Sequence, residues 1–85
     1  MEINRNEVEE RVRALLAEAL RTDARKLHSH IRLVEDLEAS SMDIVTIAVT
    51  LDDAFHVEVD LANLPSHGVT VGDVTEYVVA QLAGR

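Results

Sequence analysis

The chain has 85 residues, of which 47% are hydrophobic, with no cysteine and a formal net charge of -8 at pH 7. This length predicts one domain over residues 1–85 with a modest core. The absence of cysteine excludes a disulfide framework and a cysteine metal site. No apolar run approaches the length of a membrane span, and residues 1–6 lack a signal-peptide pattern, so we expect a cytoplasmic protein with no membrane partner.

The negative charge is concentrated in the second part of the chain. Residues 1–32 hold seven Lys or Arg and six Asp or Glu, a net of +1, whereas residues 33–85 hold one Arg and ten Asp or Glu, a net of -9. A domain with this much negative charge repels nucleic acid and anionic membrane surfaces, and it attracts basic patches on other proteins. Charge alone is equally compatible with a domain that only has to remain soluble.

The first predicted helix runs from Glu7 to Arg21. Asn6 is its expected N-cap, with Glu9 as the reciprocal partner. Its apolar stripe comprises Val8, Val12, Leu15, Leu16 and Ala19. The pattern is typical of a helix that buries one face.

Residues 22–39 form a long connection without glycine or proline. Its apolar residues are too sparse for a helical stripe, and we expect them to hold the connection against the helix ends; they are Leu27, Ile31, Leu33 and Leu37. One turn of helix is expected between Asp23 and Leu27. His28 and His30 have the spacing of a metal-binding pair, but no further ligand lies nearby in the sequence, so exposed loop histidines are favoured and no metal is expected.

A second helix is predicted from Ser41 to Phe55. Ser40, with Asp43 three residues later, fits an N-cap with an acidic reciprocal partner. Ser41 would be the first helical residue, where a phosphate ester on its hydroxyl would face unpaired backbone N–H groups. A plain serine at a helix start is the common alternative.

This second helix carries two apolar stripes at about 100° per residue. The first is a core stripe of Ile44, Ile47, Ala48, Leu51, Ala54 and Phe55. The second consists of Met42, Val45 and Val49, with Thr46, Asp52 and Asp53 beside it. Both faces cannot easily be core in a small domain, so we interpret the second stripe as an exposed docking surface edged with acid. A central helix packed on both faces is the alternative.

The sequence after Phe55 predicts a link, a short helix and a last long helix. Val57 and Val59 alternate with polar residues, and an extended link is preferred to an isolated strand. Asp60 can cap a short helix over residues 61–64, which Pro65 and Gly68 end. The last helix runs from Val71 to about Ala83, with Thr70 and Asp73 as its N-cap pair, Gly84 at its end and a stripe of Val71, Val74, Val78 and Leu82.

The predicted fold is therefore all-α. Three main helices and one short helix form a small up-down four-helix bundle with a long first loop. No catalytic constellation is apparent, because a triad at Ser41 would need a histidine poised over it, and no spacing in the chain argues for one.

Residues 36–43 resemble the attachment motif of acyl carrier proteins, Asp-Leu-x-Ala-x-Ser-apolar-Asp before an apolar helix. Ser41 matches the serine that takes a 4′-phosphopantetheine arm, the match continues through Leu51 and Phe55, and residues 70–78 resemble the last helix of the family. The resemblance implies a non-catalytic, stand-alone carrier that holds acyl or aminoacyl groups as thioesters in fatty-acid, polyketide or other specialised biosynthesis.

The resemblance also implies partners. A phosphopantetheinyl transferase would transfer the arm from coenzyme A, and acyl- or aminoacyl-loading and acyl-transfer enzymes with basic patches would dock on a monomeric carrier. The expected docking residues are Asp36, Met42, Asp43, Val45, Thr46, Val49, Asp52 and Asp53.

Three positions depart from the usual family pattern. Ser40 stands where the family usually has Asp, Met42 where it has Leu, and Thr46 where a Glu is common. These departures favour a specialised carrier over a housekeeping one. They also motivate an alternative, in which an unmodified carrier-like bundle acts as a protein–protein interaction adaptor.

Overall fold

The structure is a computed structural model that describes residues 4–59 and 68–84. Its elements in chain order are α1 (Arg5–Leu20), the 3-10 turn η1 (Ala24–Lys26), α2 (Ser41–Phe55) and α3 (Val71–Ala83). The all-α prediction is confirmed, as are the bounds of the second and last predicted helices and the turn of helix after Asp23. The short helix predicted over residues 61–64 lies outside the described residues.

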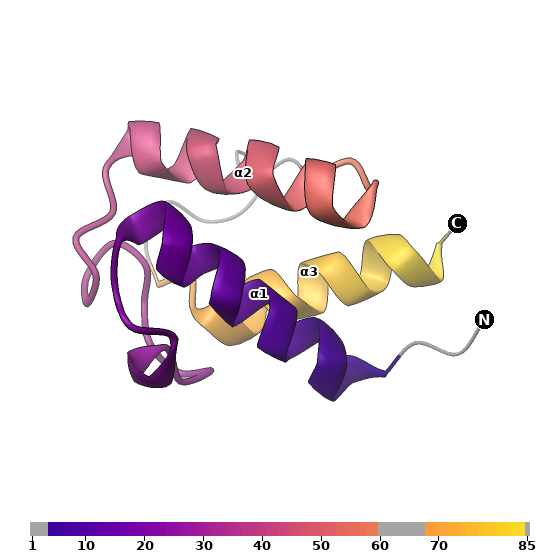
Figure 1. Cartoon of the computed structure of the whole chain (residues 1–85), viewed down its shortest axis with the longest axis horizontal. Coiled ribbons are helices and arrows are strands. Elements are labelled where there is room, and N and C mark those ends of the chain that lie inside the picture. Colours follow the sequence, from indigo (N-terminus) through magenta and orange to yellow (C-terminus); the bar gives the residue numbers. More distant parts are fainter. Residues whose placement is uncertain (1–3, 60–67, 85) are drawn as a thin grey trace.

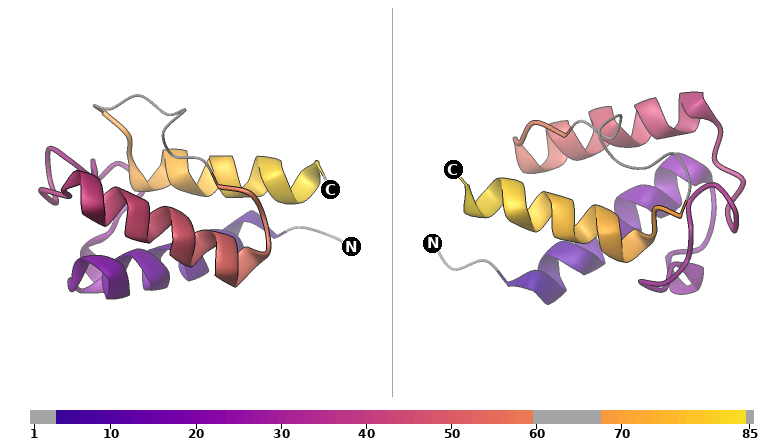
Figure 2. Two further views of the ribbon diagram at one scale, coloured as in Figure 1. Left: turned by 90° about the horizontal axis from the view of Figure 1, so that it is seen from above. Right: turned by 180° about the vertical axis from the view of Figure 1, so that it is seen from behind.

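The three helices form a small bundle in which α1 contacts both α2 and α3 (Figure 1). α1 runs in one direction along the long axis, and α2 and α3 run in the other. The end of α1, η1, the first loop and the starts of α2 and α3 therefore lie at the same end of the molecule, as the views in Figure 2 also show. Ser41, the first residue of α2, is at this loop end.

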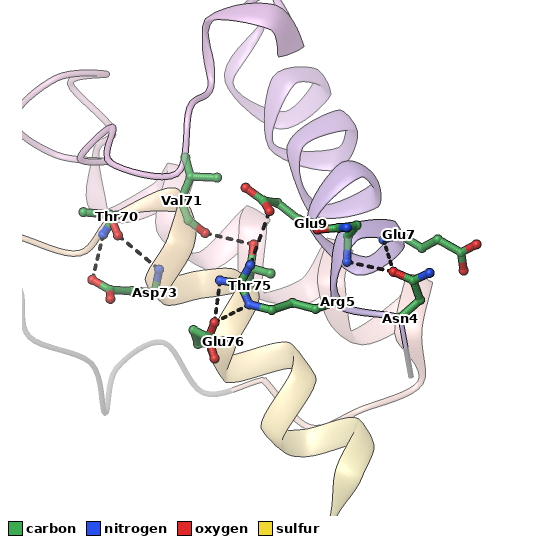
Figure 3. Close-up of polar contacts among 10 residues, drawn as sticks. Asn4, Arg5, Glu7, Glu9, Thr70, Val71, Asp73, Thr75 and Glu76 are labelled. Carbon is green, nitrogen blue, oxygen red and sulfur yellow. Dashed lines mark hydrogen bonds and ion pairs between the residues drawn. The ribbon is translucent and has the colours of Figure 1, made fainter. Parts of the chain in front are cut away.

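The predicted start of the first helix is wrong by two residues. Asn4, not Asn6, is the N-cap, and its side-chain oxygen accepts from the N–H groups of Asn6 (3.0 Å) and Glu7 (3.3 Å). The earlier start places Arg5 in the first turn, where its guanidinium pairs with Glu9 and, across the bundle, with Glu76 of α3 (Figure 3). The helix ends at Leu20, because Arg21 takes a left-handed conformation with φ 55°.

The core fills the space between the three helices. Its fully buried apolar side chains come from all of them, and from the first loop as well: Val12, Leu16, Leu27, Leu33, Ile47, Leu51, Val71, Val74 and Val78. Burial of side chains of this size contributes about 1.5–3 kcal/mol each. The expectation that apolar residues hold the first loop against the bundle is confirmed, since Leu27 and Leu33 are buried and Ile31 and Leu37 pack on the core.

The first loop is also joined to the start of α3 by backbone hydrogen bonds. Leu33 N donates to Val69 O (2.9 Å), Val71 N donates to Ile31 O (2.9 Å), and together they form an antiparallel bridge between Arg32 and Thr70. Gly72 N donates to the backbone oxygen of Ser29 (2.8 Å), and a Cβ on Gly72 would lie 3.0 Å from that oxygen. The lack of a side chain at Gly72 lets the loop and α3 approach this closely.

The capping pairs predicted for α2 and α3 are present, whereas the pair of Asn6 and Glu9 predicted for α1 is replaced by the cap at Asn4. At α3, Asp73 N donates to Thr70 Oγ1 (3.1 Å), and Thr70 N donates to Asp73 Oδ2 (3.0 Å), as drawn in Figure 3. Thr75, the one buried polar residue among those described, donates from Oγ1 to Val71 O (3.1 Å). The two capping bonds satisfy backbone N–H groups that would otherwise have no partner at the start of a helix.

Candidate functional site

The start of α2 is held by a reciprocal pair of hydrogen bonds. Asp43 N donates to Ser40 Oγ (3.1 Å), and Ser40 N donates to Asp43 Oδ2 (2.9 Å). The predicted N-cap is therefore confirmed, and Ser41 is the first residue of the helix. The pair defines the direction in which the helix starts, so it also defines where the Ser41 side chain leaves the backbone.

Ser41 is exposed at this helix start. Within the described parts of the chain, no hydrogen bond engages its hydroxyl, and none engages the N–H groups of Ser41 and Met42. Unpaired N–H groups at a helix start attract an anion, and the helix dipole has its positive end here. An accessible hydroxyl beside such donors suits the attachment of a group through a phosphate.

The second apolar stripe of α2 lies on the surface. Met42 is 73% exposed, Val45 56% and Val49 57%, and we call these three residues the apolar strip. Asp52 and Asp53 are exposed near the other end of the helix. The prediction of an exposed stripe is confirmed, and the alternative of a helix packed on both faces is wrong.

Thr46 is exposed between the residues of the apolar strip, but its hydroxyl is turned toward its own helix. Thr46 Oγ1 donates to Met42 O (3.0 Å), and Thr50 Oγ1 in turn donates to Thr46 O (2.7 Å). This back-bonding is common for threonine in helices. The Thr46 hydroxyl is therefore engaged within α2 and is less available to other groups at the surface.

Two of the predicted docking residues serve local contacts in the structure. The carboxylate of Asp43 belongs to the capping pair of α2. Asp36 lies in the first loop, and it accepts from Arg32 through both oxygens: Oδ2 from Arg32 N (2.8 Å) and Nε (3.3 Å), and Oδ1 from Nη2 (3.2 Å). The Arg32 guanidinium, with help from its backbone N–H, lowers the pKa of Asp36 below its ordinary value.

The contact between Arg32 and Asp36 was not predicted from the sequence. The only signal was the spacing of four residues between them, which favours pairing on a helix, whereas this segment was predicted as a loop. Met42, Val45, Thr46, Val49, Asp52 and Asp53 are thus brought together on α2, and Asp36 is on a separate segment.

The two loop histidines are exposed, as predicted, and their rings are stacked with centroids 5.6 Å apart. In residues 4–59 and 68–84, no group of three or more His, Cys, Asp or Glu is arranged to hold a metal ion. In the same residues, no helix is long and apolar enough to cross a membrane.

Comparison with known proteins now identifies the family. The sequence model of the protein family described as "Phosphopantetheine attachment site" matches residues 10–78 of this chain. This range includes Ser41, the whole of α2 and the start of α3. This chain belongs to the acyl carrier protein family. Its resemblance to that family, seen first in residues 36–43, is therefore confirmed over most of the chain.

Acyl carrier proteins from several bacteria are similar over nearly their whole length. The chain is 32% identical to one from Thermotoga maritima over 79 residues, which cover 93% of this chain and 96% of the relative. It is 33% identical to one from Helicobacter pylori strain J99 over 69 residues, with 81% and 87% covered. It is 34% identical to one from Helicobacter hepaticus over 71 residues, with 84% and 92% covered.

Membership of this family has chemical consequences. It implies a covalently attached 4′-phosphopantetheine prosthetic group. Acyl carrier proteins are carriers rather than catalysts, and they work with phosphopantetheinyl transferases and acyl-handling enzymes. The exposed hydroxyl of Ser41 and the free N–H groups beside it fit such a group.

Proposed function

We propose that this acyl carrier protein holds its 4′-phosphopantetheine arm on Ser41. The observation that carries the proposal is the exposed hydroxyl of Ser41 on the first residue of α2, in the segment that resembles the family attachment motif. Ser40 is the neighbouring candidate, but its Oγ already accepts the Asp43 N–H as the N-cap. Of these two serines, Ser41 is the one that combines an accessible hydroxyl with the matching motif position.

The residues of the chain itself present the hydroxyl and do not activate it. A serine hydroxyl is a poor nucleophile without a base, so the transferase must supply the base and the coenzyme A. The N–H groups of Ser41 and Met42 would then face the phosphodiester, and the helix dipole would stabilise its charge by about 0.3–1 kcal/mol. When bound, the arm supplies a thiol that carries acyl or aminoacyl groups as thioesters.

We further propose that partner enzymes dock on the apolar strip of α2 and on Asp52 and Asp53. Met42, Val45 and Val49 would enter an apolar depression, and basic residues of the partner would face the two carboxylates. Charged rims raise association rates more than affinity, and single exposed ion pairs contribute little. Such contacts suit a carrier that must leave one enzyme for the next.

Family membership supports a proposal about the cellular role. We infer a monomeric, non-catalytic carrier in the cytoplasm that serves fatty-acid biosynthesis or a related acyl-building pathway, with cargo bound to a tether that keeps it at high effective concentration. The relatives named above support this inference by their names and by their similarity over most of this chain.

Mass spectrometry tests the attachment site. The full chain without the arm is incubated with coenzyme A and a phosphopantetheinyl transferase of broad carrier specificity. The wild type should gain the mass of the arm, and Ser41→Ala should gain none. Ser40→Asp is the matched control, because it removes the adjacent hydroxyl but keeps an N-cap residue, and it should still be modified.

Either of two results would overturn this proposal. A Ser41→Ala variant that gains the same mass would place the arm on another residue. A wild-type chain that gains no mass with several transferases would favour the adaptor function instead.

A further inference from the structure

Arg32 and Asp36 hold the turn that leads to Ser41, together with a longer ion pair between Arg32 and Glu35 (4.0 Å) and a backbone bond from Glu38 N to Val34 O (3.1 Å). Asp36 accepts three hydrogen bonds from Arg32, one from its backbone N–H and two from its guanidinium. In return, Arg32 O accepts from Asp36 N (3.1 Å) and from Leu37 N (3.2 Å). A charge-assisted pair with two guanidinium bonds constrains geometry more tightly than a single contact between exposed charges.

This closed turn is anchored on both sides. On the α3 side, Arg32 forms the bridge to Thr70. On the α2 side, Ala39 N donates to Leu33 O (3.0 Å), and Ala39 is buried immediately before the N-cap Ser40. A continuous path of backbone contacts therefore runs from the start of α3, through the turn, to Ala39, two residues before Ser41.

The same contacts separate Asp36 from the acidic residues of α2. Both oxygens of Asp36 are engaged by Arg32, so little of its charge is available to a partner. In the described residues, by contrast, Asp52 and Asp53 take part in no ion pair. The local contacts of Asp36 thus argue for a role within the chain instead of a docking role.

We propose that the Arg32–Asp36 pair is a positioning element that holds the turn before α2, so that the Ser41 hydroxyl is presented in one place to the transferase. The proposal rests on Ser41 being the attachment site. Small misplacements of a reacting group lower the rate of the chemical step, and we expect Asp36→Asn and Arg32→Ala each to lower kcat for arm transfer about three- to tenfold. KM for the carrier should stay near the wild-type value.

The chain offers a matched control in the same loop. Asp23 and Arg25 form a second exposed pair of the same chemistry: Asp23 accepts from Arg25 N (2.9 Å), Nε (3.1 Å) and Nη2 (2.8 Å). This pair caps η1 and has no described contact with the turn before Ser41. Asp23→Asn and Arg25→Ala should therefore leave both kcat and KM unchanged.

The kinetic test uses the full chain without the arm, coenzyme A and a transferase of broad carrier specificity. Since both residues act as one unit, the double variant Arg32→Ala with Asp36→Asn should be no slower than either single variant. A docking role for Asp36 predicts the opposite pattern, in which Asp36→Asn raises KM and Arg32→Ala does not. That pattern, additive losses, or equal losses in the Asp23 and Arg25 controls would each overturn the proposal.

Backbone amide exchange measured by NMR provides a readout independent of the transferase. Asp36→Asn should speed exchange at Leu37 and Ala39, whereas Asp23→Asn should leave both amides unchanged. Unchanged exchange in Asp36→Asn would overturn the positioning role. A wild-type chain that takes up no arm would refute the attachment site, and the exchange data would still decide whether the pair orders the turn.

Discussion

The two faces of α2 have similar apolar residues and opposite surroundings. Ile47 and Leu51 are at most 1% exposed, whereas Val45 and Val49, two residues before each of them, are more than half exposed. The first face lies against α1 and α3, and no described element covers the second. Apolar residues on one helix of a small domain therefore need not all belong to the core, and an exposed apolar face can mark a contact surface for another protein.

The largest expected effect is the loss of stability caused by a substitution on the buried face of α2. Leu51→Ala should lower the free energy of unfolding by about 2–5 kcal/mol, because it leaves a cavity among fully buried side chains. Val49→Ala should change it by less than about 0.5 kcal/mol. Urea denaturation followed by circular dichroism measures both variants, and equal losses would mean that the two faces do not differ as described.

The next effect concerns the exposed face. Val49→Arg should raise KM for the transferase, or for an acyl-loading enzyme, by about tenfold, which corresponds to 1.4 kcal/mol. Helicity should be unchanged, since the side chain is exposed. Ala14→Arg adds the same charge to an exposed position of α1 and should leave KM near the wild-type value. Loss of helicity in Val49→Arg, or an equal rise in KM for Ala14→Arg, would contradict the docking proposal.

A smaller loss of stability is expected where Arg11 of α1 contacts the end of α2. The guanidinium of Arg11 lies 5.3 Å from the ring centroid of Phe55, and its Nη2 donates to Ala54 O (3.4 Å). Arg11→Ala should lower the free energy of unfolding by about 0.5–1 kcal/mol, the range of exposed cation–π contacts. Thermal denaturation can detect this change, and transferase kinetics should be unaffected. A kinetic defect would extend the docking surface onto α1.

The smallest expected effect on KM is at the exposed carboxylates of Asp52 and Asp53. Asp53→Lys should raise KM about two- to fivefold at low salt, because exposed ion pairs contribute up to about 1 kcal/mol. The difference from wild type should shrink as salt screens the charges. Kinetics at two ionic strengths provide the measurement, and an effect that does not depend on salt would argue against a purely electrostatic contact.

Several features of the fold were predictable because their causes are local. Ser40 with Asp43, and Thr70 with Asp73, lie three residues apart, so each pair defines a helix start without help from the rest of the chain. The start of α1 was not predictable in this way, because Asn4 and Asn6 can both serve as caps. The start that the structure adopts brings Arg5 to Glu76, 71 residues later.

The candidate site also combines features that could be predicted from the sequence with one that could not. The position of Ser41 and the exposure of Met42, Val45 and Val49 followed from a cap and from helical periodicity. The engagement of Asp36 by Arg32 did not follow, because the turn between them depends on the bridge to Thr70 and on burial of Leu33. The family resemblance alone therefore grouped Asp36 with acidic residues that lie on another element.

Capping pairs and apolar periodicity act within a few residues, and they were enough to specify where α2 and α3 begin, which side of α2 is buried and which serine starts it. The docking of the first loop on α3, and with it the pairing of Arg32 with Asp36, depends on contacts between segments more than 35 residues apart. The contacts between the loop and α3 form only when the hydrophobic core brings those segments together, so no local pattern could have indicated how the loop docks.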